Sequence, residues 1–441
     1  MPNERTASQL AADIRAGSAS ALDAVEACLA RIDEREDTVH AWAHLNPDLA
    51  RAQARAIDAA LAAGDDPGPL AGLTVGVKDI CDTFDLPTES GSDIFKGRRP
   101  AQDATLVSLL RKAGAVILGK TVTTEFAMSG ARATTNPHDA TRTPGGSSSG
   151  SGAAVADRMV HLAIGSQTGG SVIRPASFCG TYGFKPTFGC ISRAGVFLLS
   201  RRLDHIGVYG RALDDLALIG DALMVHDAAD YDMRRHPGRE LMAALAEPLD
   251  AAPRLGFVKG PPWDVAEDHM PAIFEGYVAG LGDVVTPVAL EGIFDGILDC
   301  QSTIMNASVW SNCGPHIEAH ASELLPETVR RISDGKGVLA ADYIQALDLA
   351  DSLGVALAGL FEHYDALITA GAPGEAPVGL DSTGNAAFQR MWTLTGLPTV
   401  TLPLLQGPNG LPIGVQVIGP KGKDDQVFKV AQWLDAKGAS A

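Results

Sequence analysis

The sequence predicts an α/β protein with a mixed, mostly parallel central sheet that is covered by helices on both faces. Short, almost continuously apolar runs recur along the chain, and helical patterns separate them. The runs lack the alternation of a half-exposed strand, so we expect strands that are buried on both sides. The chain has 441 residues, of which 46% are hydrophobic, and it can therefore supply the core that such a sheet needs.

The chain is expected to begin with helices. Thr6 is followed three residues later by Gln9, which is the spacing of a capping box. A second helix is predicted over 21–36, where apolar residues recur at helical spacing, and alanine-rich helix is expected to continue to about Ala63. The stretch "GDDPGPLAG" then ends the helical region, because glycine and proline interrupt regular structure.

Seven apolar runs after this break are predicted strands, and helical patterns such as "ATLVSLLRKAG" lie between them. The predicted strands cover 73–77, 115–118, 160–164, 254–258, 366–369, 399–405 and 414–419. Alternation of such strands with helices is typical of a sheet with helices on both faces.

The region from about 212 to 355 is rich in helical patterns, with "PAIFEGYVAGLGDVV" and "ADYIQALDLADSLGVALAGLFEHY" as its clearest pieces. It could be an inserted subdomain or a cover over a pocket. No composition typical of a linker marks its edges, so we expect residues 1–441 to form a single domain.

The composition argues against several classes of partner. The formal net charge is −18, and an acidic surface repels the phosphates of nucleic acids and anionic lipids. The N-terminal stretch has no apolar segment typical of a secretion signal, and no apolar run approaches the roughly 20 residues of a membrane span. Six scattered cysteines form no C-x-x-C pair, so neither a disulfide framework nor a zinc site is expected. A cytoplasmic protein is the prediction.

One motif is misleading. "GAVILGKT", residues 114–121, fits the spelling of a phosphate-binding loop. Its four variable positions should form a polar loop, but they are the apolar residues 115–118 of a predicted strand. Nucleotide binding through this motif is therefore not expected.

The segment "TPGGSSSGSGAAVA", residues 143–156, contains three consecutive serines. It contains the G-x-S-x-G spelling of a nucleophile elbow, but the chain before it has the composition of a loop and not of a strand. A flexible tether is equally unexpected, because the segment continues directly into a helix-then-strand pattern. We expect its hydroxyls to be held in place, most of them by the backbone.

A second glycine–serine segment follows a predicted strand at residues 165–180. The turn formed by Thr168, Gly169, Gly170 and Ser171 could direct successive amides toward one point, and glycines allow close approach of a ligand. Such amides can form an oxyanion hole, in which one donor contributes about 3 kcal/mol to catalysis. Ser171, at the end of the turn, is a candidate nucleophile.

A serine nucleophile needs a base, and no histidine has a convincing position. Lys78 ends the apolar stretch "LTVGV", where an ammonium group is costly to bury. Asp79 could form an ion pair with it. Burial without such a partner would lower the pKa of the lysine and make it a usable base, and serine–lysine pairs are a known variant of the catalytic triad.

Taken together, "VGVKD", "PGGSSSGSGAAVA" and "GSQTGGSVIRPASFCGTYGFKP" resemble the amidase signature family in order and spacing. The signature covers about 70–188, and "GLPTVTLPLLQGPNGLPIGVQVIGP" resembles the closing strands of the family. The region 212–355 matches least. The resemblance implies the amidase signature fold.

The resemblance also implies roles for three residues. Lys78 matches the base of the family, Ser171 its nucleophile and Ser147, 24 residues before Ser171, its bridging serine, which typically follows a cis peptide at Gly146. The implied enzyme is an amidase that hydrolyses carbon–nitrogen bonds through a Ser–Ser–Lys triad and an acyl-enzyme intermediate. The amides of Thr168–Ser171 would hold the oxyanion. No metal or other cofactor is implied.

The sequence narrows the substrate less. Arg174 could bind a carboxylate of the substrate, or it could form an internal ion pair that supports the turn. Ala127 and Met128 are further candidate substrate-binding residues. Several apolar side chains could line a pocket for aryl amides or for the aryl carbamates that a urethanase cleaves, although most of them fit the core equally well. These side chains are Phe126, Met128, Phe178, Phe197, Leu198 and Leu199.

Two alternatives remain at this stage. Some members of the family are amidotransferase subunits that supply ammonia to form glutamine or asparagine on a tRNA. The chain differs from that group in "SGARATTNPHD" after "EFAM", and it has no long C-terminal extension. A protein that binds nucleotides without chemistry is the second alternative. The favoured prediction is a monomer or homodimer that acts on a small amide or carbamate, without nucleic acid or membrane partners.

Overall fold

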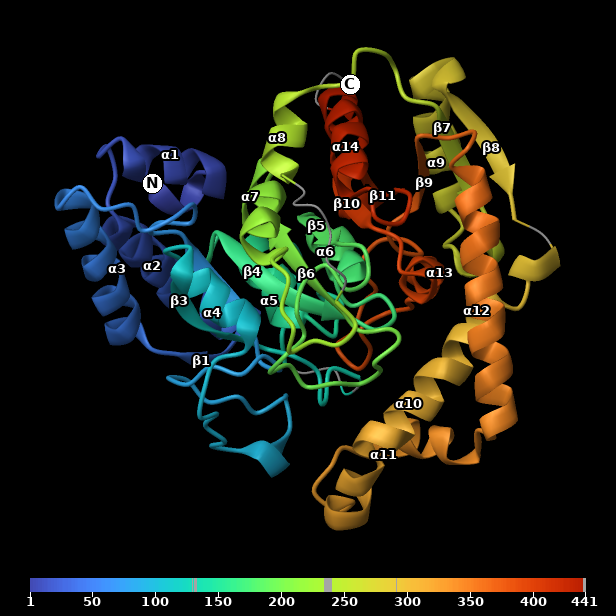
Figure 1. Ribbon diagram of the computed structural model, residues 1–441, viewed down its shortest axis with the longest axis horizontal. Helices are drawn as coiled ribbons and strands as arrows, with labels where there is room; N and C mark the ends of the chain where they lie inside the picture. The colour runs from blue at the N-terminus through green and yellow to red at the C-terminus, as the bar shows by residue number, and fades with distance from the viewer. Residues whose placement is uncertain (129, 131–132, 234–239, 291, 439–441) are drawn as a thin grey trace.

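The computed structural model describes residues 1–128, 130, 133–233, 240–290 and 292–438. Eleven strands of these residues form one sheet, in the order β1-β3-β2-β4-β6-β5-β10-β11-β9-β7-β8 (Figure 1). The strands are β1 (Trp42–Leu45), β2 (Thr74–Lys78), β3 (Val116–Thr121), β4 (Leu162–Gln167), β5 (Tyr182–Lys185), β6 (His205–Gly210), β7 (Leu255–Lys259), β8 (Val285–Ala289), β9 (Ala366–Ala370), β10 (Thr399–Gln406) and β11 (Pro412–Ile418).

The α/β class and the mixed sheet are confirmed, but the parallel majority is not. Four strand pairs are parallel: β2 with β3 and β4, and β7 with β8 and β9. Six pairs among the described strands are antiparallel. The central strands β6, β5, β10 and β11 pair antiparallel throughout, so parallel pairing is confined to two separate parts of the sheet.

All seven predicted strands exist, with ends shifted by a few residues. The sequence analysis missed β1, β5, β6 and β8. β1 and β5 have only four residues each, β6 ("HIGVYG") is interrupted by glycine, and β8 contains a proline. Such short or interrupted segments give weak periodic signals, and a proline disfavours a strand in the middle of a sheet.

Fourteen α-helices are found among the described residues. They are α1 (Ala7–Arg15), α2 (Ala21–Val39), α3 (Pro47–Ala62), α4 (Thr105–Lys112), α5 (Ser149–Ala156), α6 (Ile173–Cys179), α7 (Leu213–Leu223), α8 (Leu241–Ala246), α9 (Met270–Leu281), α10 (Ile297–His320), α11 (Pro326–Ser333), α12 (Ala340–Leu360), α13 (Ala387–Thr395) and α14 (Asp424–Gly438).

The helices cover both faces of the sheet, as predicted. The buried side chains of α2 and α5 form one apolar cluster with residues of β3 and β4. Those of α4, α7 and α14 form another, with the alternate residues of the central strands. A third cluster joins α10, α12 and α13 to β7, β8 and β9, at the opposite end of the molecule from the N-terminal helices (Figure 1).

The first elements differ in one respect from the prediction. Thr6 and Gln9 form the expected capping box at the start of α1. The alanine-rich region is not continuous helix to Ala63, because α2 ends at His40 in a left-handed conformation and β1 intervenes before α3. His40 has a φ of 51°. The helical periodicity of the sequence could not reveal a strand of four residues.

The region 212–355 contributes to several layers. Its helices α7 and α8 pack with α14, and β7 and β8 extend the main sheet. Helix α10 packs against both α11 and α12, and α10 and α11 project from the sheet at the lower right of Figure 1. None of the helices in the described part of the chain combines the length and apolar composition that a membrane span requires.

Candidate active site

Lys78 is the last residue of β2 and is fully buried. Because β2 and β4 are parallel, with Val77 opposite Ile164, the ends of both strands lie at the same edge of the sheet. Lys78 Nζ donates to Ser147 Oγ and to Ser166 Oγ, both at 2.8 Å. Burial lowers the pKa of Lys78 to about 7. About half of the amine is therefore unprotonated and available as a base at pH 7.

Asp79 does not form an ion pair with Lys78. Its carboxylate lies 3.2 Å from Nζ of Lys120, which also donates to Thr88 Oγ1 at 2.6 Å. Lys120 belongs to β3, so residues 116–121 of the phosphate-loop spelling form a buried strand, in keeping with the strand predicted at 115–118. Asp79, the acidic residue next to Lys78 in sequence, thus pairs with a lysine of the neighbouring strand β3 and not with Lys78.

The segment 143–148 brings Ser147 to Lys78. It precedes α5, and its Gly146–Ser147 peptide is cis, as the resemblance implied. The amide of Thr124 donates to the carbonyl of Ser147 at 3.2 Å. Ser148 Oγ donates to the Ser166 carbonyl at 3.3 Å, and Ser149 Oγ donates to the Gly145 carbonyl at 2.8 Å. These two neighbouring hydroxyls hold the loop in place, and the hydroxyl of Ser147 faces the lysine.

The turn 168–171 follows β4 and is held from several sides. Thr168 Oγ1 donates to Asp204 Oδ1 at 2.6 Å. The carbonyl of Thr168 accepts from Gln301 Nε2 at 3.2 Å, and that of Gly169 accepts from Thr393 Oγ1 at 2.7 Å. The described residues provide no acceptor for the amides of Thr168–Ser171. The turn therefore presents fixed, unused donors, which is what an oxyanion hole requires.

Ser171 closes this turn and is partly exposed, in contrast to the buried Lys78 and Ser147. Its carbonyl accepts from the Tyr209 hydroxyl at 3.1 Å. Within the described part of the chain, Ser171 Oγ makes no hydrogen bond to Ser147 Oγ. The structure thus contains the lysine–serine contact of the predicted triad, while the second step to Ser171 is not formed as a hydrogen bond.

Several residues of this site were missed by the sequence analysis. Ser166 and Ser147 both accept a hydrogen bond from Lys78, and the position of Ser166 two residues after the predicted strand 160–164 was the one signal that could have identified it. The Asp204 carboxylate is buried and accepts from the amides of Leu199 and Ser200 as well as from the Thr168 hydroxyl. Burial raises the pKa of Asp204, and these hydrogen bonds oppose that shift.

The predicted substrate-binding residues lie in different surroundings. Ala127 borders a small cavity together with Ser166 and Thr168. Met128 is buried, and its carbonyl accepts from Arg331 Nη1 at 3.4 Å. Ala127 therefore lies close to the turn and to Ser166, a partner of Lys78, whereas the contact of Met128 is with α11. Residues 129 and 131–132 of "SGARATTNPHD", which distinguished this chain from amidotransferase subunits, lie outside the described residues.

Arg174 is almost completely buried and is committed to the protein itself. Its Nη2 donates to the carbonyl of Gly146 at 2.6 Å and to Thr383 Oγ1 at 3.1 Å, and its Nη1 donates to the carbonyl of Gly384 at 2.6 Å. Burial lowers its pKa to about 9. In this arrangement Arg174 supports the serine loop through uncharged oxygens, and the internal ion pair that was the alternative to carboxylate binding is not found among the described residues.

The six predicted apolar side chains do not form one pocket. Phe126 and Phe197 stack with ring centroids 5.2 Å apart, in a cluster with Phe95 and His316 of α10. Phe126, Phe178 and Leu199 are core residues, each 2% exposed or less. Met128 is also buried, whereas Leu198 is 36% exposed.

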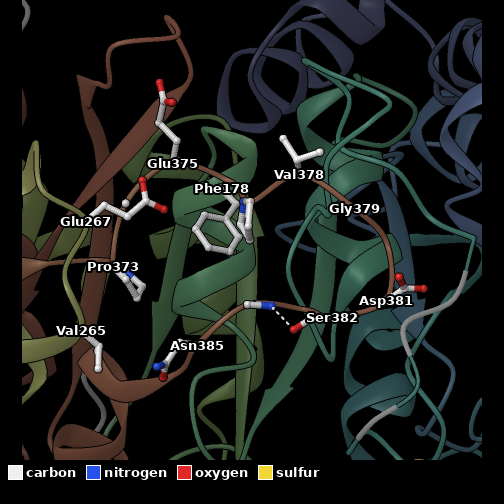
Figure 2. Close-up of a pocket in the computed structure, with 13 residues that line it drawn as sticks. Phe178, Val265, Glu267, Pro373, Glu375, Val378, Gly379, Asp381, Ser382 and Asn385 are labelled. Atoms are coloured by element: carbon white, nitrogen blue, oxygen red, sulfur yellow. Dashed lines mark hydrogen bonds between the residues drawn. The ribbon is translucent and has the colours of Figure 1, made fainter.

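Phe178 lines a separate cavity of about 480 Å³ (Figure 2). Pro373, Val378, Glu267 and Asp381 also border it. Lys78, Ser147 and Ser171 are not among its lining residues, so the cavity is distinct from the predicted reaction site. The chain around Gly384 borders the cavity and also holds Arg174 through its carbonyl.

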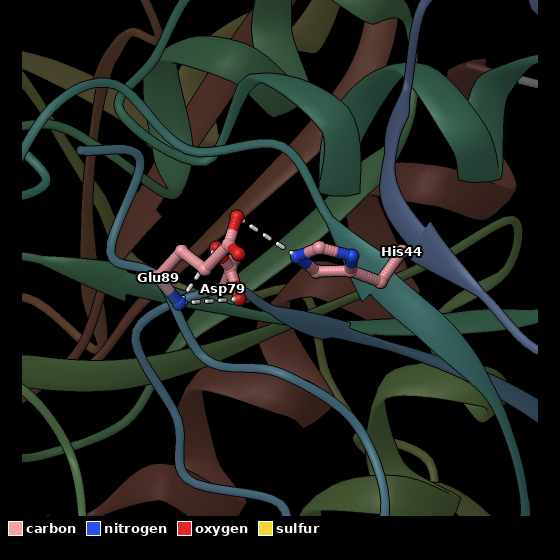
Figure 3. Close-up of side chains that lie close together, drawn as sticks. All are labelled: His44, Asp79 and Glu89. Carbon is pink, nitrogen blue, oxygen red and sulfur yellow. Dashed lines mark hydrogen bonds and ion pairs between the residues drawn. The ribbon is translucent and has the colours of Figure 1, made fainter. Parts of the chain in front are cut away.

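A cluster of His44, Asp79 and Glu89 is the one group in the described part of the chain that could hold a metal ion. Figure 3 shows the three side chains facing one another. His44 Nε2 lies 3.0 Å from Glu89 Oε2, and the amide of Glu89 donates to the Asp79 carboxylate. Because Lys120 already balances the charge of Asp79, these contacts are explained as polar contacts around the Lys120–Asp79 ion pair.

Fold and site together define an α/β protein with a buried amine–hydroxyl pair beside a turn of free amides. Residues 23–428 match the Amidase family model, and the chain belongs to this family. It is 34% identical to the glutamyl-tRNA(Gln) amidotransferase A subunit of Salinispora arenicola, over 98% of this chain and 96% of that protein. The corresponding protein of Corynebacterium jeikeium is 33% identical over the same shares.

Solved structures give a similar result. A structure described as a vestigial protein complex that reveals the origins of an s-triazine catabolic enzyme has a TM-score of 0.91 and 29% identity, over 98% of both chains. The native peptide amidase of Stenotrophomonas maltophilia has a TM-score of 0.84 and 27% identity, over 99% of this chain and 97% of that one. The family and these neighbours support an amide-cleaving enzyme.

Proposed function

We propose that the protein hydrolyses the carbon–nitrogen bond of small-molecule amides, with Ser171 as nucleophile, Ser147 as bridging serine and Lys78 as base. The observation that carries this proposal is the contact of 2.8 Å between Lys78 Nζ and Ser147 Oγ, in a place where burial lowers the lysine pKa to about 7. An unprotonated amine can accept a proton from a hydroxyl, whereas an ammonium group cannot.

In the proposed reaction, Ser171 Oγ attacks the amide carbonyl carbon and gives its proton to Ser147, whose own proton passes to Lys78. The second contact that this needs, from Ser147 to Ser171, would form when the substrate is bound, because hydrogen bonds of catalytic groups often tighten only then. The same relay returns the proton to the leaving nitrogen. Water then hydrolyses the acyl-enzyme and releases the acid.

The amides of Thr168–Ser171 would stabilise the negative oxygen of the tetrahedral intermediate. Support for this role comes from their lack of acceptors among the described residues and from the fixed carbonyls of Thr168 and Gly169. A rigid set of donors needs no reorganisation during the reaction, which is the origin of such catalysis.

Helix α10 of the region 212–355 would act as a cover over this site. Gln301 contacts the turn at Thr168, Asn312 Nδ2 donates to the Leu199 carbonyl at 2.9 Å, and His316 packs on Phe126. Three positions along one helix therefore follow the edge of the predicted site. These contacts of α10 do not distinguish between aryl amides, aryl carbamates and carboxylated amides as substrates.

The experiment combines covalent labelling with turnover. A fluorophosphonate should label wild-type protein at Ser171, and mass spectrometry of the labelled peptide should identify that residue. Ser171→Ala should lower the turnover of small amides by ~10⁵-fold or more, as for other serine nucleophiles. Ser147→Ala should be severely impaired as well. Full activity in either variant would contradict the assignment.

An amidotransferase subunit is the second candidate, and the 34% identity to an amidotransferase A subunit over nearly the whole chain favours it. The two candidates differ in what the chain does alone. Ammonia release from small amides by the purified chain supports a free-standing hydrolase. Release of ammonia from glutamine only after mixing with the other amidotransferase subunits supports the second candidate.

A monomeric or homodimeric state and a cytoplasmic location stay predictions. Light scattering on the purified protein checks the oligomeric state.

A further inference from the structure

Arg390 lies on the side of α13 that faces the predicted oxyanion turn. Gly170 of the turn lies against the start of this helix. A Cβ added at Gly170 would collide with Ala386, the N-cap of α13, and with Gln389 of the helix itself. Thr393 donates to the carbonyl of Gly169. Positions 386, 389, 390 and 393 recur at intervals of three and four residues and therefore share one face of a helix. Arg390 is thus placed beside the turn that carries Ser171.

The guanidinium group of Arg390 reaches across to α10. Its Nη1 donates to Ser302 Oγ at 3.2 Å, and Ser302 Oγ itself donates to the Leu298 carbonyl at 2.9 Å. Gln301, the residue before Ser302, contacts the carbonyl of Thr168. Arg390 and Ser302 therefore lie between the two helices that hold the turn in place.

Arg390 differs from the other arginines near the turn in having neither an ion pair nor a full set of hydrogen-bond acceptors among the described residues. Arg174 uses three protein oxygens, and Arg331 pairs with Glu327 at 3.2 Å. Arg390 forms no ion pair within the described residues, and Asp299 attracts it only from a greater distance. Burial and the charge of Arg331 both lower the pKa of Arg390, and the attraction of Asp299 only partly opposes this shift.

A partly buried cation with one hydroxyl partner has most of its donors unused. A guanidinium group carries five N–H donors in a planar fork that matches the two oxygens of a carboxylate. An anion in this place would supply the missing counter-charge, and Ser302 would hold the fork in orientation. The position next to the turn makes the substrate itself the natural source of that anion.

We propose that Arg390, oriented by Ser302, binds a carboxylate of the substrate, so that the protein acts on anionic amides such as monoamides of dicarboxylic acids. This inference rests on the proposed function, because it assigns the substrate class of the same site. It also moves the carboxylate from Arg174, which is committed to the serine loop, to an arginine with free donors.

The test measures kcat/KM for malonamate, succinamate and glutaramate and for the neutral diamide of each acid. Wild-type protein should prefer at least one monoamide over its diamide. In Arg390→Gln the ratio of the two kcat/KM values should fall by about 10- to 100-fold, as expected for loss of a hydrogen-bonded charge pair. Free malonate, succinate or glutarate should inhibit the wild type competitively. A much higher concentration of the same dicarboxylate should be needed to inhibit Arg390→Gln.

Arg254→Gln is the matched control, because Arg254 forms an exposed ion pair with Asp365 on another part of the sheet. Its substrate ratio and its inhibition should equal those of the wild type. Ser302→Ala provides a second variant, with a smaller fall in the ratio, if Arg390→Gln does not fold.

The outcomes separate this inference from the proposed function. An unchanged ratio in both Arg390→Gln and Ser302→Ala, or a wild-type preference for neutral amides, overturns the carboxylate site and leaves the hydrolase standing. Absence of both fluorophosphonate labelling and amide turnover in the wild type overturns the proposed function, and the inference falls with it.

Discussion

Lys78 and Lys120 occupy neighbouring parallel strands, and both are fully buried. They differ in what surrounds the amine. Lys120 faces the Asp79 carboxylate at 3.2 Å, whereas Lys78 faces the hydroxyls of Ser147 and Ser166. A carboxylate partner favours the charged form of a lysine, and burial with hydroxyl partners favours the neutral form.

The comparison shows how one sheet uses the same residue type in two ways. Burial lowers the pKa of both lysines, but at Lys120 the charge of Asp79 opposes the shift. Lys120 thus belongs to an ion-pair network that supports the fold, and Lys78 has the properties of a base. The sequence "VGVKD" places Asp79 directly after Lys78, and only the structure shows that the carboxylate is committed elsewhere.

Between the two lysines, the larger expected effect on turnover comes from removing the amine at position 78. Lys78→Met should lower the turnover of small amides by about 1,000-fold or more, because the base of the proposed relay is lost. The chain should still fold, since methionine fills a similar volume without a charge. Steady-state rates together with circular dichroism check both parts. Turnover of Lys78→Met near the wild-type level would show that Lys78 is not the base, and the functional difference between the two lysines would disappear.

The same substitution at Lys120 should act mainly on stability. Lys120→Met leaves the carboxylate of Asp79 buried without its cation, which should lower the free energy of unfolding by about 3–5 kcal/mol. Urea denaturation measures the loss. The double variant Lys120→Met/Asp79→Asn should recover much of it, because the uncompensated charge is gone. A single variant as stable as the wild type would show that the pair does not support the fold.

The sequence predicted those parts of the molecule that local patterns encode. Apolar runs identified seven of the strands, and the capping box at Thr6 identified the start of α1. The glycine–serine segments and the lysine after a strand pointed to Lys78, Ser147 and Ser171 through a family resemblance. These features are contiguous in the chain, so their signals survive without knowledge of the fold.

The supporting contacts could not be predicted in the same way. Gln301 lies 133 residues from Thr168, and Thr393 lies 224 residues from Gly169. No local motif links an amide or a hydroxyl on a helix to a turn so far away in sequence. The role of Arg174 was undecided for the same reason, because its partners Gly146, Thr383 and Gly384 come from two distant loops.

The pH dependence of the reaction sharpens the comparison further. Lys78 is protonated below its pKa of about 7 and is then unable to accept a proton. The value of kcat/KM should therefore rise by about tenfold per pH unit below pH 7 and level off above it, since this quantity reports the pKa of the free enzyme. Rates measured from pH 5 to 9 test the profile. A plateau that begins only near pH 10 would mean that Lys78 is charged like an exposed lysine.

The smallest expected effect is that of Ser166→Ala, which removes one of the two hydroxyl partners of Lys78. A neutral hydrogen bond contributes about 1 kcal/mol, so kcat/KM on the plateau should fall by roughly five- to tenfold, far less than in Lys78→Met. Ser166 Oγ accepts a hydrogen bond from Nζ, and an acceptor stabilises an ammonium group more than an amine. Its loss should also move the rise of the pH profile toward lower pH.

This shift of the profile separates a role in tuning the base from a general loss of packing. Ser166→Thr keeps a hydroxyl at the same position and should restore both the rate and the wild-type profile. Ser151→Ala is a matched control, because Ser151 Oγ donates to the carbonyl of Ile164 on the same strand and has no contact with Lys78. If Ser166→Ala lowers kcat/KM but does not shift its pH dependence, Ser166 does not influence the pKa of Lys78, and Ser147 is its only hydroxyl partner with such an effect.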